Sequence, residues 1–318
     1  MTWKTVVAQP SLLGESPFWH PDEKMLYWVD VSGRQIHRLD AVMGGVQSWF
    51  MPSEPGCIAP ACRQRSEYPA GNNTTGLVIA LRDGIYRVDA WGGVLHLLAP
   101  ALHDPATTRF NDGRADTRGR FWASTIYEPR NAPLAKLFCL DRRFSHGGVE
   151  ASLEIKAGGA TTGNGLAWSP DGSTLYWADT PSHTIRAWDW DSKANLLSRE
   201  RVFSQWPGKP SGWQPGQPGY GGRPDGAAVD TQGNYYVAMY EGARLLKLSP
   251  QGETLADIAV PAQCPTMPCF GGSDLKTLYL TTARAKRSAD ELQRYPNSGC
   301  VFSMQVDVPG LPVNFFHD

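Results

Sequence analysis

The strongest constraint on this chain is a β-hairpin unit that recurs along its length. The clearest copy of the unit runs from Gly163 to Asp179. In it, the apolar run Leu166–Trp168 and the β-branched and aromatic run Thr174–Ala178 flank the turn signal Pro170-Asp171-Gly172. Asn164 stands between two glycines just before the first predicted strand, where glycine allows a tight bend and a close approach by another group.

Six such units can be followed along the 318 residues. They begin near Gly14, Cys57, Arg109, Gly163, Pro224 and Pro268. The equivalent residues Asn111, Asn164 and Asp225 are 53 and 61 residues apart. A period of this size, with three or four short strands in each unit, predicts an all-β fold: a six-bladed β-propeller in which residues 1–318 form a single domain. A β-sandwich or a two-domain all-β protein is the alternative, but neither requires a repeat.

Three further features fit this interpretation. Thr5–Ala8 reads as a strand that completes the last blade beside Cys300–Met304 and closes the ring. No long segment shows sustained helical spacing of apolar residues, so helix should be scarce. The six cysteines lack a Cys-x-x-Cys spacing and the N-terminus lacks an export signal, so we expect buried free thiols.

The charge of the chain argues against two classes of partner. A formal net charge of -1 gives no basic footprint for a nucleic acid or an anionic membrane, and no apolar run is long enough to span a bilayer. We therefore expect a cytoplasmic protein with no nucleic-acid or membrane partner. A monomer is the simplest expectation for its assembly.

Four polar residues stand at the same place in four of the repeats: Glu15, Asn111, Asn164 and Asp225. The innermost strand of each propeller blade lines the central channel, so these side chains are expected to meet around one channel mouth. Carboxylate and amide oxygens suit a hard divalent cation, calcium above all, with zinc, manganese and magnesium also admitted. Each residue alone could be an ordinary turn residue. Four of them at equivalent positions favour a metal site with room for water and substrate.

The motifs around these residues resemble those of one known family. In chain order they are Gly14-Glu15-Ser16-Pro17, Arg109-Phe110-Asn111-Asp112-Gly113, Gly163-Asn164-Gly165-Leu166, Pro224-Asp225-Gly226 and Cys269-Phe270-Gly271-Gly272. Over nearly the whole chain, this set resembles the senescence marker protein (regucalcin), gluconolactonase and luciferin-regenerating enzyme family. The resemblance implies a six-bladed propeller, one divalent metal ion held by Glu15, Asn164 and Asp225, and hydrolysis of sugar-acid lactones.

The resemblance also implies residues that face the substrate. Arg109 and Asn111 are two of them. In relatives, a further acidic residue after the second strand of the third blade helps to hold the sugar. Here that region reads Thr125-Ile126-Tyr127-Glu128-Pro129, so Glu128 is the candidate and Tyr127 is its rival.

The hypothesis that follows is a gluconolactonase-like, metal-dependent opening of an aldonolactone to an aldonic acid. It combines Lewis-acid polarisation of the carbonyl with attack by water, and Asp225 serves as the general base. Two alternatives stay open: the same metal site could act on aryl esters or phosphotriesters, or the chain could be a calcium-binding propeller without catalysis. The sequence does not choose among the lactones or their ring sizes.

One long segment directly precedes Asp225. Residues 205–220 are rich in Gly and Pro and carry Trp206, Trp213 and Tyr220, which offer flat surfaces for a sugar. We expect this loop to lie on the mouth side, where it would partly cover the site. The alternative is an exposed loop that packs its own aromatic side chains.

Overall fold

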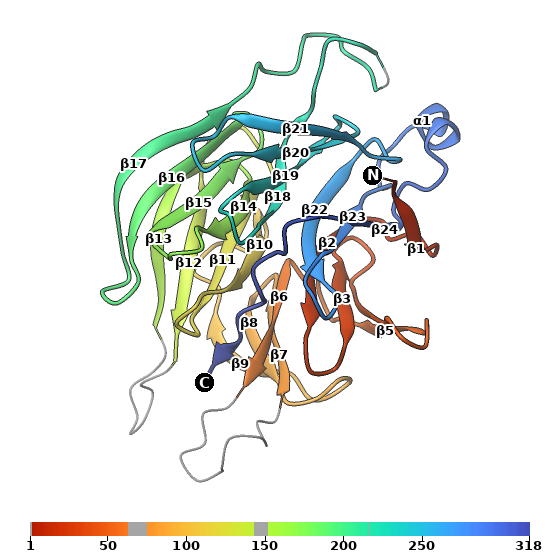
Figure 1. Ribbon diagram of the computed structural model, residues 1–318. Helices are drawn as coiled ribbons and strands as arrows, with labels where there is room; N and C mark the ends of the chain where they lie inside the picture. Colours follow the sequence, from red (N-terminus) through yellow and green to blue (C-terminus); the bar gives the residue numbers. More distant parts are fainter. Residues whose placement is uncertain (1, 63–74, 143–151, 216) are drawn as a thin grey trace.

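The computed structural model describes residues 2–62, 75–142, 152–215 and 217–318. Within them, six sheets stand around a central channel, so the predicted six-bladed β-propeller is confirmed (Figure 1). The inner strands of neighbouring sheets contact one another in the cyclic order β2, β6, β10, β14, β18 and β22, and β22 returns to β2. No helix among these residues has the length and hydrophobicity needed to cross a membrane.

Each blade runs from an inner strand on the channel to an outer strand at the rim. The first blade comprises β2 (Gly14–His20), β3 (Met25–Asp30), β4 (Gln35–Asp40) and β5 (Val46–Phe50). The second comprises β6 (Cys57–Cys62), β7 (Thr75–Leu81), β8 (Gly84–Val88) and β9 (His96–Pro100). The third comprises β10 (Thr108–Ala115), β11 (Phe121–Tyr127), β12 (Ala135–Asp141) and β13 (Ser152–Ala160).

The remaining blades repeat this order. The fourth comprises β14 (Gly163–Trp168), β15 (Thr174–Asp179), β16 (Thr184–Asp191) and β17 (Leu196–Gln205). The fifth comprises β18 (Arg223–Val229), β19 (Tyr235–Tyr240), β20 (Arg244–Leu248) and β21 (Thr254–Ala259). The sixth comprises β22 (Pro265–Gly271), β23 (Thr277–Thr282) and β24 (Val301–Gln305), and β1 (Lys4–Val7) completes it.

The ring closes as the sequence predicts. β1 pairs antiparallel with β24, with Lys4 opposite Ser303, so the first strand of the chain forms the outer edge of the last blade. This pairing joins the first strand of the chain to the last strand of the sixth repeat in one sheet and so closes the ring. The six cysteines are buried and free, as expected.

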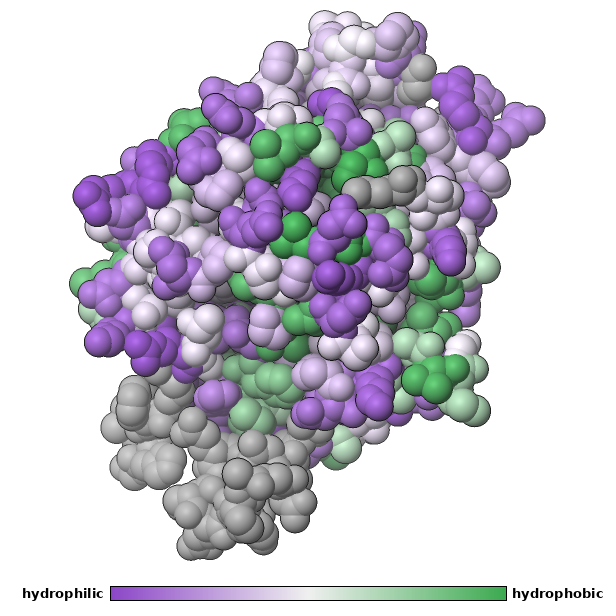
Figure 2. All heavy atoms as spheres, viewed as in Figure 1, coloured by the Kyte–Doolittle hydropathy of each residue, from purple (hydrophilic) through white to green (hydrophobic). Residues whose placement is uncertain are grey.

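The core is divided into six clusters, and each lies between two neighbouring blades. Phe18 and Tyr27 of the first blade, for example, pack with Ile58 and Ile79 of the second. The cluster between the sixth and first blades joins Trp19 and Trp28 to Tyr279. Burial of apolar surface between blades thus holds the ring together at every junction, including the closing one. On the face shown in Figure 2, hydrophobic side chains form small groups separated by hydrophilic ones.

Two short elements were not expected from the sequence. The helix α1 (Ala289–Arg294) lies between β23 and β24, and the Ser288 side chain caps it by accepting from the Glu291 N–H. Near the C-terminus, β25 (Phe316–His317) pairs parallel with the inner strand β6, with Phe316 opposite Ala61. Its Phe316 side chain is fully buried in the cluster between the second and third blades.

Candidate active site

A polar cavity of about 120 Å³ lies at one end of the central channel. Residues from the first part of the inner strands line it, whereas residues from the last part of the same strands line a second cavity at the other end. The four residues predicted to meet at one mouth, Glu15, Asn111, Asn164 and Asp225, all line the first cavity, and so does Arg109. Closure of the ring therefore brings together side chains up to 210 positions apart.

Irregular strand pairing aims these side chains. The register of β2 shifts just after Glu15, that of β14 just after Asn164, and that of β18 around Asp225. Such β-bulges turn a side chain away from its regular direction and are common beside active sites. Strand β6, in contrast, pairs without a shift and supplies no residue to the cavity.

The bulges also correct one expectation. Asn164 does not precede its strand: β14 begins at Gly163, and pairing continues through Asn164 opposite Ala178 before the shift. Gly165 then adopts a φ of +60°, and a Cβ there would overlap the hydroxyl of Tyr235, which donates to the Gly165 carbonyl at 2.5 Å. The glycine after Asn164 is therefore needed for both the bend and the close approach.

A chain of hydrogen bonds orients the two amides. Arg109 Nη1 donates to Asn111 Oδ1 at 2.9 Å, and Asn111 Nδ2 donates to Asn164 Oδ1 at 2.9 Å. Asn164 Nδ2 in turn donates to Thr180 Oγ1 at 2.8 Å. These bonds hold Asn164 Oδ1 on the Asn111 side, and the oxygen keeps a second lone pair for another partner.

The two carboxylates that line the cavity lack ion-pair partners among the described residues. Glu15 and Asp225 are only 7% and 6% exposed, and neither forms an ion pair with a described residue. Burial, with the neighbouring Asp225 and Asp112, raises the pKa of Glu15 well above its usual value. Burial and Asp112 likewise raise the pKa of Asp225 well above its usual value. An ionised pair here is costly unless a cation joins it.

The donor set fits such a cation. Glu15, Asn164 and Asp225 offer only oxygen ligands, and from the described residues the Glu15 carboxylate accepts one hydrogen bond, from the Ser16 N–H at 3.3 Å. Hard divalent cations prefer oxygen ligands of this kind. In the described part of the chain, no group of three or more His, Cys, Asp or Glu side chains is arranged to hold a metal ion. The candidate set combines two carboxylates with an amide.

The two remaining predicted residues lie beside the cavity rather than in its lining. Glu128 accepts hydrogen bonds from Arg82 at 2.9 and 3.3 Å, and its carboxylate lies 3.7 Å from Arg109 Nε. Tyr127 is half-buried, and its backbone N–H donates to Thr161 at 3.0 Å. Neighbouring Ile126 and Arg130 line the cavity in their place. Substrate contact by Glu128 or Tyr127 stays a prediction.

Sequence reasoning missed several lining residues. Thr180, Arg130, Arg223 and Tyr240 all border the cavity. Arg223 immediately precedes the motif at Asp225 and could have been found from that position. Tyr240 ends the second strand of its blade, and Thr180 and Arg130 follow second strands, where the repeat gives no polar signature. Asp112 was part of a motif but received no role: it is 2% exposed, and one of its oxygens accepts from the Leu166 N–H at 2.8 Å.

The loop of residues 205–220 lies near the cavity but does not line it. Two of its aromatic side chains, Trp213 and Tyr220, pack on each other with 4.9 Å between ring centroids. The Tyr220 hydroxyl also lies 2.8 Å from Nε2 of His183 in the fourth blade. These contacts match the alternative in which the loop packs its own aromatics. Partial cover of the site by this loop stays a prediction.

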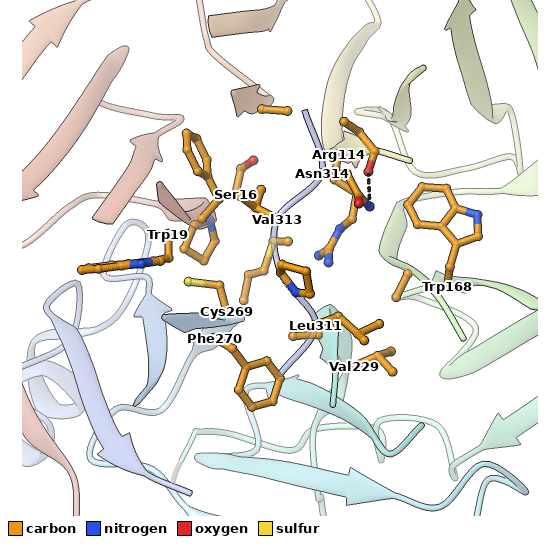
Figure 3. A pocket seen from close by; sticks show the side chains of 18 of the residues that line it. Ser16, Trp19, Arg114, Trp168, Val229, Cys269, Phe270, Leu311, Val313 and Asn314 are labelled. Atoms are coloured by element: carbon orange, nitrogen blue, oxygen red, sulfur yellow. Dashed lines mark hydrogen bonds between the residues drawn. The ribbon is translucent and has the colours of Figure 1, made fainter. Parts of the chain in front are cut away.

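The second cavity, of about 290 Å³, has a different character (Figure 3). Apolar side chains such as Trp19, Phe270 and Val313 dominate its lining. The C-terminal segment crosses it: Leu311 N–H donates to the Val229 carbonyl at 3.1 Å, and Asn314 Nδ2 donates to the Ala115 carbonyl at 3.3 Å. None of the predicted site residues lines this end, so the polar cavity is the candidate active site.

Comparisons with known proteins agree with the fold and the motifs. The family described as the SMP-30/gluconolactonase/LRE-like region matches residues 13–284. A 6-deoxy-6-sulfogluconolactonase of Pseudomonas putida is 41% identical over 97% of this chain and 96% of its own. A pentonolactonase of Haloferax volcanii is 31% identical over 98% of this chain and 97% of its own. The crystal structure of a calcium-binding protein, regucalcin, from Agrobacterium tumefaciens shares the fold, with a TM-score of 0.84 at 23% identity over 99% of this chain and 97% of that one.

Proposed function

The chain belongs to the SMP-30/gluconolactonase/LRE-like family, and from that premise we propose that it is a lactonase that opens a sugar-acid lactone with the help of a divalent cation. The observation that carries this proposal is the pair of buried carboxylates, Glu15 and Asp225, which border one cavity and form no ion pair with a described residue. Relatives named for sugar-lactone hydrolysis support the reaction class. One of those names specifies a gluconolactone with a sulfo group at carbon 6.

Glu15, Asn164 and Asp225 would hold the cation. Calcium is the first choice because all three ligands are oxygens and the calcium-binding regucalcin shares the fold. When bound, a divalent cation supplies Lewis-acid polarisation of the lactone carbonyl and stabilisation of the developing oxyanion.

Asp225 is proposed as the general base. Its carboxylate reaches the cavity and makes no side-chain hydrogen bond with the described residues, so an oxygen is free to accept a proton. Water adds to the carbonyl carbon as Asp225 takes its proton. The ring C–O bond then breaks, and the departing ring oxygen accepts that proton from Asp225 and becomes a hydroxyl. The product is the open-chain sugar acid.

Arg109 and Asn111 are proposed to position the substrate. Arg109 Nη1 donates to the Phe110 carbonyl and to Asn111 Oδ1, both at 2.9 Å, whereas Arg109 Nη2 has no hydrogen-bond partner among the described residues. That N–H group can donate to a sugar oxygen in the cavity. Asn111 braces the Asn164 amide, so its loss should disturb the ligand set as well as the substrate.

The test is acid release from a panel of aldonolactones, aryl esters and phosphotriesters, measured with and without chelator and with metal content determined on the same sample. We expect metal-dependent hydrolysis of at least one aldonolactone and none in Asp225→Ala. Asp257→Asn, which removes an exposed carboxylate paired with Arg244, is the matched control and should stay active. Turnover near wild type in Asp225→Ala would remove this residue from the mechanism, and no metal-dependent hydrolysis would favour a binding protein.

A further inference from the structure

The cavity has more positive side chains than the reaction needs. Three guanidinium groups line it, Arg109, Arg130 and Arg223, against the two carboxylates of Glu15 and Asp225. A divalent cation on those carboxylates would leave no acidic side chain in the lining to balance the guanidinium charges. The lining is therefore suited to a substrate that brings negative charge of its own.

Arg109 is largely occupied within the protein. It donates to the Phe110 carbonyl and to Asn111, and it lies 3.7 Å from the Glu128 carboxylate. Arg130 is different: it is exposed, and its side chain makes no hydrogen bond or ion pair with the described residues. A bare guanidinium at the edge of a cavity keeps its full set of donors for a ligand.

Arg223 is only partly compensated. It shares the Glu241 carboxylate, at 3.2 Å, with Lys209 at 2.9 Å and Arg287 at 3.2 Å. Arg287 has a second partner in Glu291 at 2.7 Å, but Lys209 and Arg223 have no other carboxylate among the described residues. The Nε of Arg223 is buried without a hydrogen-bond partner. One carboxylate therefore serves three cations, and positive charge remains on the Arg223 side of the cavity.

The two arginines lie at a different depth from the carboxylates. Glu15 and Asp225 are nearly inaccessible, whereas Arg130 is exposed and the Arg223 side chain is 22% exposed. Both arginines line the same cavity of about 120 Å³ as Asp225. A substrate whose lactone carbonyl reaches Asp225 would thus place its other end between Arg130 and Arg223.

We propose that the substrate is an anionic sugar lactone whose sulfonate, phosphate or carboxylate group, at the end remote from the carbonyl, is held by Arg130 and Arg223. This inference rests on the proposed lactonase function. Guanidinium groups form forked, charge-assisted hydrogen bonds with oxyanions, and a hydroxyl at the same place would leave the charges uncompensated. The shared chemistry is an oxyanion with two or more acceptor oxygens.

The test compares kcat/KM for gluconolactone with that for gluconolactones carrying a sulfonate or a phosphate at carbon 6, and for a lactone with a carboxylate at that carbon. We expect wild type to prefer one of the anionic lactones at least tenfold. Arg130→Ala should lower kcat/KM for the anionic lactone at least tenfold more than for the neutral one, mainly through KM. Arg130→Lys should recover part of this loss. The preference should weaken as salt concentration rises.

Arg201→Ala is the matched control, because Arg201 is exposed and pairs with Asp189 on an outer strand of the fourth blade. It should leave the preference as in wild type. Equal hydrolysis of neutral and anionic lactones, or equal losses for both in Arg130→Ala, would overturn the anion subsite while leaving the lactonase intact. Absence of hydrolysis of every lactone would instead refute the proposed function. Arg130 is exposed, so its replacement should not prevent folding.

Discussion

Replacing Asp225 with asparagine should abolish activity and yet stabilise the metal-free protein. Asp225 and Glu15 border one cavity of about 120 Å³. Two like charges about 6 to 8 Å apart repel by about 2 to 3 kcal/mol at an effective dielectric constant of about 20, and we take this as the size of their repulsion. Asparagine has nearly the same shape and carries no charge. Removing one carboxylate should therefore raise the free energy of unfolding in the presence of chelator.

The corresponding shift in melting temperature can be estimated from chain length. For 318 residues the unfolding entropy near the midpoint is about 0.7 kcal/mol/K, so the expected increase in Tm is about 3 to 4 °C. Calorimetry of wild type and Asp225→Asn at pH 8 with EDTA measures this directly. Both proteins must unfold reversibly for the comparison to report equilibrium stability.

Asp230→Asn is the matched control. Asp230 is also fully buried, but it accepts from the backbone N–H of Gln232 and Asn234 at 2.9 Å and from Asn234 Nδ2 at 2.8 Å. Its replacement puts an NH2 donor in place of an accepting oxygen, opposite groups that also donate, and should lower Tm. If Asp225→Asn also lowered Tm in EDTA, the two carboxylates would not be an uncompensated pair, and the argument for a cation at this place would fail.

Three further outcomes follow from the same geometry. The stability of wild type relative to Asp225→Asn in EDTA should fall as pH rises from about 4 to 8, because the raised pKa of Glu15 and of Asp225 makes the native state hold more protons than the unfolded chain; a pH-independent difference would contradict this. Calcium at about 100 times its Kd should stabilise wild type by about 2.7 kcal/mol, or roughly 4 °C in Tm, and an equal shift in Asn164→Ala would exclude that residue as a ligand. Gly165→Ala should lower the free energy of unfolding, measured by urea denaturation, by about 2 to 3 kcal/mol, because of the positive φ and the lost Tyr235 hydrogen bond. Gly172→Ala is the control: its φ is also positive, at +68°, but the space around it is open, so it should cost only about 1 kcal/mol. Equal costs would show that the close approach to Tyr235 is unimportant.

The repeat explains which parts of the molecule the sequence could reveal. Glu15, Asn111, Asn164 and Asp225 occupy equivalent places in their blades, so the symmetry of a propeller was enough to bring them together. Arg130 follows a second strand, where no repeated polar position points to the channel. Its approach to the cavity depends on how one turn folds.

Other features were invisible for physical reasons as well. β25 is a two-residue strand that pairs with β6 across more than 250 positions, so no local pattern announces it. The six residues of α1 are too few to show helical periodicity. The bulges, finally, are a property of strand pairing, and only the glycine after Asn164 hinted at one of them.

The C-terminal segment has a consequence for turnover. It ties Gly310 and Leu311 to the fifth blade, Asn314 to the third and Phe316 to the second, and so lies across the channel end remote from Glu15. In a lactonase with this arrangement, the channel mouth beside Arg130 gives the direct access to Glu15 and Asp225. The sugar-acid product must then leave through the same opening by which the lactone entered, so product release competes with the binding of the next substrate molecule.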